Sequence, residues 1–443
     1  MVNMTISQTA NAVAHRELSA RDLAAQYIKE INKNAHLRAV IELNPDAEDI
    51  AKKLDESVSL GILCGVPILI KDNVNTGDKM RTAAGSVALA ENIAGQDAKA
   101  VKLLRDAGAL ILGKTNMTEF ANYMVDFKTG TPMPNGYSSR GGQTVSTYGP
   151  DVDPSGSSTG SAVAVAAGLC AAAVGSETYG SIISPSQRAG IVGIKPSAGL
   201  VSSDGVIPIS FTLDTLGPMA RCVEDAALLL GVLAGQKYDI DSSLRIRAGI
   251  LRNSIDKADP EWVEANKNLL DIMRELGMDL AELTDHDIDD SFVFPIMRHE
   301  FRYGINKYLK SQNNTTIPQS LADIIAYNNQ HAETALRYGQ SNLEAANEVG
   351  GDWAEAPEYV SALTAREAAT RSLLAIFDSN KLDVVLMLSA HCGLAAACGF
   401  PSITLPIGFT SNGLPIGSCL IARPFDESTL INAAHKIETF IQR

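Results

Sequence analysis

The sequence has few cysteines and no long hydrophobic run, and these absences exclude several classes of protein. Its 443 residues include six cysteines and no C-x-x-C pair, which indicates neither a disulfide framework nor a zinc site. The longest run of small apolar residues, 162–174, is shorter than the roughly 18 residues that span a bilayer. We therefore predict that no segment crosses a membrane and that residues 162–174 form a buried core helix.

Basic residues are also scarce relative to acidic ones. The 37 Lys and Arg residues against 51 Asp and Glu residues give a formal net charge of -14, so a nucleic-acid partner is not expected. The N-terminus lacks the basic stretch followed by an apolar stretch that marks a secretory signal, which predicts a cytoplasmic protein. No H-E-x-x-H, no cluster of His and Cys, and no G-x-G-x-x-G after a strand occurs, so we predict no metal and no organic cofactor.

Four stretches of the chain differ in their patterns, and we interpret them as parts of a single domain, residues 1–443. Residues 1–58 have helical periodicity and form a helical lead-in, whereas residues 60–235 alternate short apolar runs with helical segments. Residues 255–380 are helical and charged, which predicts a helical insertion, and strand-like runs return in residues 381–443 before a final helix. Strands alternating with helices predict an α/β layer fold.

Two short catalytic patterns occur without the context that they need. Residues 108–115 match the phosphate-binding pattern G-x-x-x-x-G-K-[ST], with Lys114 as the phosphate ligand, but the intervening Ala-Leu-Ile-Leu is typical of a strand rather than a loop. Residues 156–160 match G-x-S-x-G, which would make Ser158 the nucleophile of an α/β-hydrolase-type esterase. That motif needs a buried strand before its serine, whereas the preceding YGPDVDPS is typical of a turn. The esterase remains an alternative.

A longer set of segments carries a more specific pattern. Its members are 65–73 (GVPILIKDN), 155–168 (SGSSTGSAVAVAAG), 175–185 (GSETYGSIISP), 190–201 (GIVGIKPSAGLV) and 214–221 (DTLGPMAR). Lys71 ends an apolar strand, so its amine either reaches water or is held dry with a lowered pKa. Ser157 and Ser158 precede a helix, where hydroxyl groups can simply cap the helix. Ser181 lies on a predicted tight turn whose backbone N–H groups can bind an anion.

These segments together resemble the amidase signature family, serine hydrolases with a Ser-Ser-Lys triad and no histidine. The resemblance implies a large twisted mixed β-sheet flanked by helices. It places the nucleophile on Ser181, the bridging serine with its cis peptide on Ser157, and the lysine on Lys71. The oxyanion hole falls on the backbone N–H groups of Thr178, Tyr179, Gly180 and Ser181.

The chain departs from the common family pattern at the nucleophile turn. Most members have D-T-G-G-S-I-R where residues 177–183 are E-T-Y-G-S-I-I, and the glutamate resembles a subgroup of bacterial peptide amidases that typically has E-T-D-G-S. Tyr179 replaces the aspartate of that subgroup, so we expect Tyr179 to contact the substrate and to favour neutral or apolar acyl groups over cationic ones. Residues 382–402 form a shorter segment than is usual in the family, which predicts a more open wall of the substrate cleft.

The resemblance implies hydrolysis of a carboxamide, either a small amide or a C-terminal peptide amide, to an acid plus ammonia or an amine. Ser181 would attack the carbonyl while Ser157 relays its proton to neutral Lys71. For this role the lysine pKa, ordinarily about 10.4, must be lowered by about three. Asp72 would oppose that change only if it faced the amine, and side-chain alternation in a strand points it to the other face.

Other outcomes stay open at this stage. A divergent member of the family could bind an amide without cleaving it, which makes a non-catalytic amidase-like binding protein the second alternative. The expected partner is a small-molecule or short peptide amide substrate, without nucleic acid or membrane. The sequence leaves open whether the protein forms a homodimer.

Overall fold

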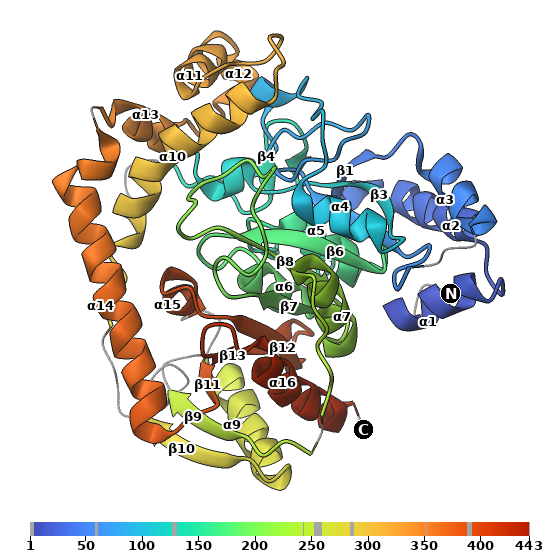
Figure 1. Cartoon of the computed structure of the whole chain (residues 1–443), viewed down its shortest axis with the longest axis vertical. Helices are drawn as coiled ribbons and strands as arrows, with labels where there is room; N and C mark the ends of the chain where they lie inside the picture. The colour runs from blue at the N-terminus through green and yellow to red at the C-terminus, as the bar shows by residue number, and fades with distance from the viewer. Residues whose placement is uncertain are drawn as a thin grey trace.

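A single mixed β-sheet forms the centre of the protein (Figure 1). The computed structural model describes residues 4–57, 61–125, 131–241, 243–251, 259–283, 288–350, 352–387 and 392–442. The sheet strands are β1 (Val40–Leu43), β2 (Pro67–Lys71), β3 (Leu110–Thr115), β6 (Ala172–Glu177), β7 (Val192–Lys195), β8 (Thr215–Ala220), β9 (Arg247–Leu251), β10 (Asp279–Leu283), β11 (Val384–Met387), β12 (Ser402–Phe409) and β13 (Pro415–Ala422). They lie in the order β1-β3-β2-β6-β8-β7-β12-β13-β11-β9-β10. The predicted α/β fold with a large mixed sheet is confirmed.

Helices surround this sheet. The N-terminal ones are α1 (Ile6–Ala14), α2 (Ala20–Lys33) and α3 (Ala47–Glu56), followed by α4 (Lys99–Asp106), α5 (Thr159–Ala166), α6 (Ile183–Ala189) and α7 (Val223–Ala234). Later helices are α9 (Pro260–Glu275), α10 (Val293–Ser311), α11 (Leu321–Gln330), α12 (Ala332–Ala335), α13 (Ser341–Glu348), α14 (Pro357–Asn380), α15 (Cys392–Ala397) and α16 (Glu427–Ile441). Short pieces complete the list: η1 (Ala35–Leu37), η2 (Val87–Leu89), η3 (Glu119–Asn122), η4 (Trp353–Glu355) and the pair β4 (Tyr137–Ser138) with β5 (Gly142–Gln143). Among the helices that the structure describes, none is long and apolar enough to cross a membrane.

Helices α10 to α14 of the predicted insertion lie together, whereas α9, which also belongs to it, packs against β12, β13 and α16. Figure 1 shows α10 to α14 along the side opposite the N-terminal helices α1 to α3. Their apolar faces share one core with the sheet, including the buried side chains of Phe301, Leu373 and Phe377. This shared core holds α10 and α14 against the sheet.

Three strands occupy segments that the sequence predicts to be helical. β1 lies inside the lead-in of residues 1–58 and pairs antiparallel with β3, and β10 lies inside the insertion of residues 255–380 and pairs parallel with β9. The predicted helix over residues 162–174 is wrong in its second half, because α5 ends at Ala166 and the run continues as β6. Periodicity cannot separate a buried helix from a buried strand in an all-apolar run. The unusual segment expected at residues 382–402 includes residues 388–391, which lie outside the described residues.

Strand β2 shows how the core is divided between the two faces of the sheet. Ile68 and Ile70 pack in the core with α4, α7 and α16, whereas Leu69 packs on the opposite face with α2, α3 and α5. Side chains alternate between the faces of a strand, so Lys71 follows Leu69 onto the face of α5. The serines that precede α5 are on that same face.

Candidate active site

Two parallel neighbours, β2 and β6, bring the candidate catalytic residues to one edge of the sheet. β2 pairs parallel with β6, and Lys71 is the last residue of β2. β6 ends at Glu177, four residues before Ser181. The carboxyl ends of parallel strands meet at the same edge of a sheet, which is where ligands bind in open α/β folds. The lysine and the turn that carries Ser181 therefore lie side by side.

The amine of Lys71 is fully buried among oxygen atoms. Its Nζ lies 2.8 Å from Ser157 Oγ, 2.8 Å from Ser158 Oγ and 3.0 Å from the carbonyl oxygen of Ser176. The contact between Lys71 and Ser157 is the one that the family resemblance implies. Ser176 was not predicted from the sequence, although it lies inside the quoted segment 175–185.

Burial lowers the pKa of Lys71 to about 7, although the charges of Asp214 and Glu177 act in the opposite direction. Desolvation disfavours the charged ammonium, and nearby carboxylates favour it. The result is a lysine with a large fraction of neutral amine near neutral pH. Such an amine can accept a proton from a neighbouring hydroxyl group.

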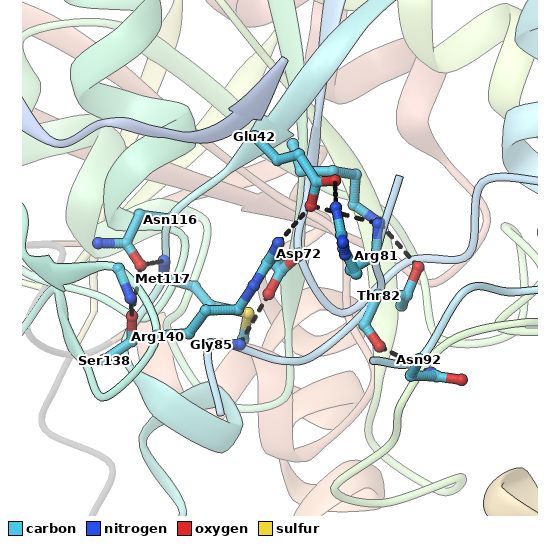
Figure 2. A network of polar contacts seen from close by, with 12 residues as sticks. Glu42, Asp72, Arg81, Thr82, Gly85, Asn92, Asn116, Met117, Ser138 and Arg140 are labelled. Carbon is cyan, nitrogen blue, oxygen red and sulfur yellow. Dashed lines mark hydrogen bonds and ion pairs between the residues drawn. The ribbon is translucent and has the colours of Figure 1, made fainter. Parts of the chain in front are cut away.

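Asp72 points to the other face of β2, as strand alternation predicts. Its Oδ1 accepts a hydrogen bond of 3.0 Å from Arg140 Nη1, and its Oδ2 accepts one of 2.9 Å from the Gly85 N–H. Figure 2 shows Arg140 between Asp72 and Glu42, with Arg81 bound to the far side of Glu42. This network neutralises the carboxylate that follows the lysine in sequence.

The Gly/Ser-rich segment before α5 presents two serines to the lysine. The peptide bond between Gly156 and Ser157 is cis, the form that the family resemblance places at this serine. The carbonyl oxygen of Ser157 accepts a hydrogen bond of 3.1 Å from the Thr118 N–H, and its side chain is fully buried. A Cβ added to Gly156 would lie 2.4 Å from Thr118 Oγ1, so the close approach of these two segments requires glycine.

Ser158 is held by the neighbouring strand. Its hydroxyl donates to the Ser176 carbonyl at 2.9 Å and accepts from the Ser176 N–H at 3.2 Å. Ser158 is the residue before α5, yet its side chain forms no capping hydrogen bond, so simple helix capping does not explain it. A buried hydroxyl with these partners, and no strand directly before it, lacks the exposed elbow that an α/β-hydrolase nucleophile needs.

The turn after β6 carries the four N–H groups predicted to form the oxyanion hole. The carboxylate Oε2 of Glu177 accepts hydrogen bonds from the N–H groups of Ile182 at 2.6 Å and Ile183 at 3.0 Å. These bonds hold the two residues that follow Ser181 against the end of β6. Gly180 has φ +89°, a left-handed conformation that favours glycine. Within the described part of the chain, the N–H groups of residues 178–181 donate to no other residue. They are therefore available to an anion.

Ser181 lies beside Ser157 and Ser158. Its carbonyl oxygen accepts a hydrogen bond of 3.1 Å from the Ser158 N–H, and the residue is 9% exposed. The hydroxyl forms no hydrogen bond to any residue that the structure describes, so the side-chain link to Ser157 is not closed here. Catalytic hydrogen bonds of this kind often tighten only when a substrate is bound.

Two carboxylates near the turn of residues 178–181 were not predicted from the sequence. Asp214 accepts from Thr178 Oγ1 at 2.6 Å, and burial raises the pKa of its carboxyl to about 6. Asp214 opens the quoted segment 214–221, but nothing in that pattern predicts its contact. Asp290 accepts a hydrogen bond from the Tyr179 hydroxyl and lies far away in sequence, so no local pattern indicates it. Among the described residues, no three His, Cys, Asp or Glu side chains gather as metal ligands.

Comparison with known proteins decides the family. The family model described as Amidase matches residues 22–431. The chain belongs to the amidase family. A probable amidase of Arabidopsis thaliana is 35% identical, with 98% of this chain and 89% of that protein covered. One subunit of the glutamyl-tRNA(Gln) amidotransferase of Thermosynechococcus vestitus is 29% identical, with 98% of this chain and 97% of that subunit covered.

A solved structure narrows the resemblance further. The native peptide amidase from Stenotrophomonas maltophilia superposes with a TM-score of 0.91 at 33% identity, covering 99% of this chain and 97% of that one. The predicted membership of the amidase signature family, and the resemblance to its peptide amidase-like subgroup, are thus confirmed. This amidase is a hydrolase of carbon–nitrogen bonds.

Proposed function

We propose that this amidase hydrolyses a carboxamide through an acyl-enzyme on Ser181, with Ser157 and Lys71 as the proton relay. The observation that carries the proposal is the contact of 2.8 Å between Lys71 Nζ and Ser157 Oγ, together with a lysine pKa of about 7. This is the base that a serine nucleophile needs when no histidine is available. The free N–H groups of the adjacent turn supply the second requirement, a site for the developing oxyanion.

In the acylation step, Ser181 Oγ forms a bond to the carbonyl carbon of the amide. Its proton passes to Ser157, whose own hydroxyl proton passes to the neutral amine of Lys71. The carbonyl oxygen becomes an oxyanion held by the N–H groups of Thr178, Tyr179, Gly180 and Ser181. When the carbon–nitrogen bond breaks, the leaving amine takes the proton back along the same route.

Deacylation repeats these transfers with water in place of Ser181. Water attacks the ester carbon and gives a proton to the relay. The bond between that carbon and Ser181 Oγ breaks, the relay returns the proton to Ser181, and the carboxylic acid leaves. Each oxyanion donor typically contributes about 10² to 10³ in rate, so the turn matters as much as the base. An oxyanion donor at position 179 is a backbone group, which is why a tyrosine can occupy that position.

The substrate class proposed is a small amide or the C-terminal amide of a short peptide. The similarity to a peptide amidase over nearly the whole chain supports the second of these. The leaving group would then be ammonia. We propose no nucleic-acid or membrane partner, which agrees with the excess of acidic residues.

Ammonia release from a panel of carboxamides and amidated peptides tests the proposal. The native protein is compared with Ser181→Ala and Lys71→Ala, and with Lys79→Ala as a control at an exposed lysine paired with Asp46. Release should persist in the control and disappear in the other two. Equal release in all variants would show that the triad is misassigned.

The non-catalytic alternative has its own outcome. A serine-reactive fluorophosphonate should label Ser181 in the native protein and should not label that position in Lys71→Ala. If the native protein neither releases ammonia nor takes the label, a binding protein without catalysis is the better description.

A further inference from the structure

Tyr179 connects the nucleophile turn to two distant segments. Its hydroxyl donates to Asp290 Oδ2, in the residues just before α10. Its ring packs against α15, since a Cβ added to Gly393 would lie 2.5 Å from Tyr179 Cζ. The side chain is 37% exposed, so part of the ring faces solvent beside Ser181. One residue therefore supplies a backbone N–H to the oxyanion turn and a side chain to the rim of the site.

Asp290 has no cationic partner among the residues that the structure describes. Its carbonyl oxygen accepts from the Val293 N–H at 3.1 Å, which places the residue at the start of α10. Among the described residues, no Lys, Arg or His forms an ion pair with Asp290 and nothing donates to its Oδ1. The carboxylates of Glu42 and Asp72, by contrast, are both paired with arginines. Within the described part of the chain, Asp290 thus offers a carboxylate without a counter-charge and an Oδ1 without a donor.

The tyrosine limits how far this charge can lie from the oxyanion turn. The carboxylate of Asp290 is separated from the backbone of the oxyanion turn by at most the length of the Tyr179 side chain and one hydrogen bond. An extended peptide advances about 3.3 to 3.6 Å per residue, so this span corresponds to about two residues of substrate. The first residue of a dipeptide amide carries its ammonium group at that distance from the scissile bond.

We propose that Asp290, oriented by Tyr179, is a specificity-determining residue that binds an ammonium group on the acyl side of the substrate. The favoured class is a short peptide amide with a free N-terminus. This inference rests on the function proposed above, and it differs from the sequence-based expectation that Tyr179 favours neutral acyl groups. Tyr179 stands where the peptide amidase subgroup has an aspartate, but its hydroxyl binds the carboxylate of Asp290.

Glycyl-leucinamide and acetyl-leucinamide test the inference because they differ only by the ammonium group. The native protein should show a higher kcat/KM for the glycyl substrate, mainly through a lower KM. Asp290→Asn keeps an acceptor oxygen for the tyrosine and removes the charge. It should reduce the ratio of the two kcat/KM values by about fivefold, the size of one partly exposed ion pair.

Asp289→Asn is the matched control. Asp289 is an exposed neighbour with the same charge, and its carboxylate is bound to Ser291 instead of the tyrosine. It should leave the ratio unchanged. Tyr179→Phe keeps the ring and removes the hydroxyl, so the ratio should fall while the fold, measured by circular dichroism, is retained. Inhibition of the native protein by the two products gives a readout separate from turnover: glycyl-leucine should bind more tightly than acetyl-leucine.

The outcomes separate this inference from the proposed function. Ammonia release from both substrates with a ratio near one, or a ratio that Asp290→Asn does not change, would overturn the inference and leave the amidase mechanism standing. If neither substrate nor any other amide releases ammonia, the proposed function itself fails and the inference falls with it.

Discussion

Lys71 and Asp72 are consecutive residues whose side chains lie in separate polar networks on opposite faces of the sheet. Lys71 Nζ is 2.8 Å from Ser157 Oγ, and Asp72 Oδ1 is 3.0 Å from Arg140 Nη1. The carboxylate nearest to the lysine in sequence is therefore bound elsewhere. Burial can then dominate the pKa of the amine, which is the condition for its role as a base.

The pH dependence of activity should reflect the pKa of Lys71. The amine is neutral above its pKa of about 7, so kcat should rise with pH through that region. Asp214 favours the ammonium, so Asp214→Asn should lower the lysine pKa and move the acidic limb to lower pH. The measurement is kcat against pH for one amide in both proteins. A limb that moves to higher pH would contradict the assignment of the base.

Ser158→Ala should weaken catalysis without removing the nucleophile. The variant loses one contact of Lys71 and the hydrogen bonds to Ser176, so kcat should fall about 10- to 100-fold. Ser161→Ala is the matched control, since Ser161 is also buried but lies within α5 and bonds to Thr115. Serine-reactive labelling at Ser181 should survive in both. Loss of all labelling in Ser158→Ala would favour the esterase alternative.

Asp72→Asn should destabilise the fold. Removing one charge of a buried ion pair typically costs about 3 to 5 kcal/mol of stability. Arg140 would still be paired with Glu42, so we expect a loss near the lower end of that range. Urea unfolding of the two proteins measures the difference. Lys79→Ala breaks the exposed pair with Asp46 and should cost much less, because exposed ion pairs contribute little to stability. Equal losses in the two variants would mean that the network in Figure 2 adds little stability.

Gly180→Ala should reduce kcat more than it reduces stability. Gly180 has φ +89°, and a left-handed conformation costs an alanine about 1 to 2 kcal/mol. Relaxation of that strain would move the adjacent N–H groups of the turn. Gly199→Ala provides the control, since Gly199 has φ +85° and nothing within 4 Å of an added Cβ. Both variants should lose similar thermal stability, and only Gly180→Ala should lose about tenfold or more in kcat.

Local sequence pattern predicted the parts of the site that depend on local structure. The apolar run of residues 66–70 before Lys71 indicated a buried strand, which is β2, and the turn at Gly180 and Ser181 follows soon after β6. The motif at residues 108–115 was correctly assigned to a strand: Lys114 lies in β3 and its amine bonds to the Val74 carbonyl at 2.5 Å. In these cases the local pattern indicated which element carries the residue, although the groups that contact Lys71 and Lys114 lie 86 and 40 positions away.

Long-range contacts could not be predicted in this way. Asp290 reaches Tyr179 across 111 positions, and no periodicity in either segment indicates that contact. The partner of Asp72, Arg140, is 68 positions away and lies in a segment of turns. β1 is a strand only because its four residues find an antiparallel partner in β3. Such features depend on tertiary packing, which local propensity does not determine.

The complete burial of Lys71 at the end of β2 has a consequence for chemical labelling. An amine-reactive reagent in solution meets exposed lysines such as Lys79 at once, but it reaches Lys71 only when the site or the sheet opens. A neutral amine of low pKa is also the more reactive form once it is exposed. The rate at which Lys71 is acylated, followed by mass spectrometry of a single peptide, would therefore report how often the middle of this amidase opens to water.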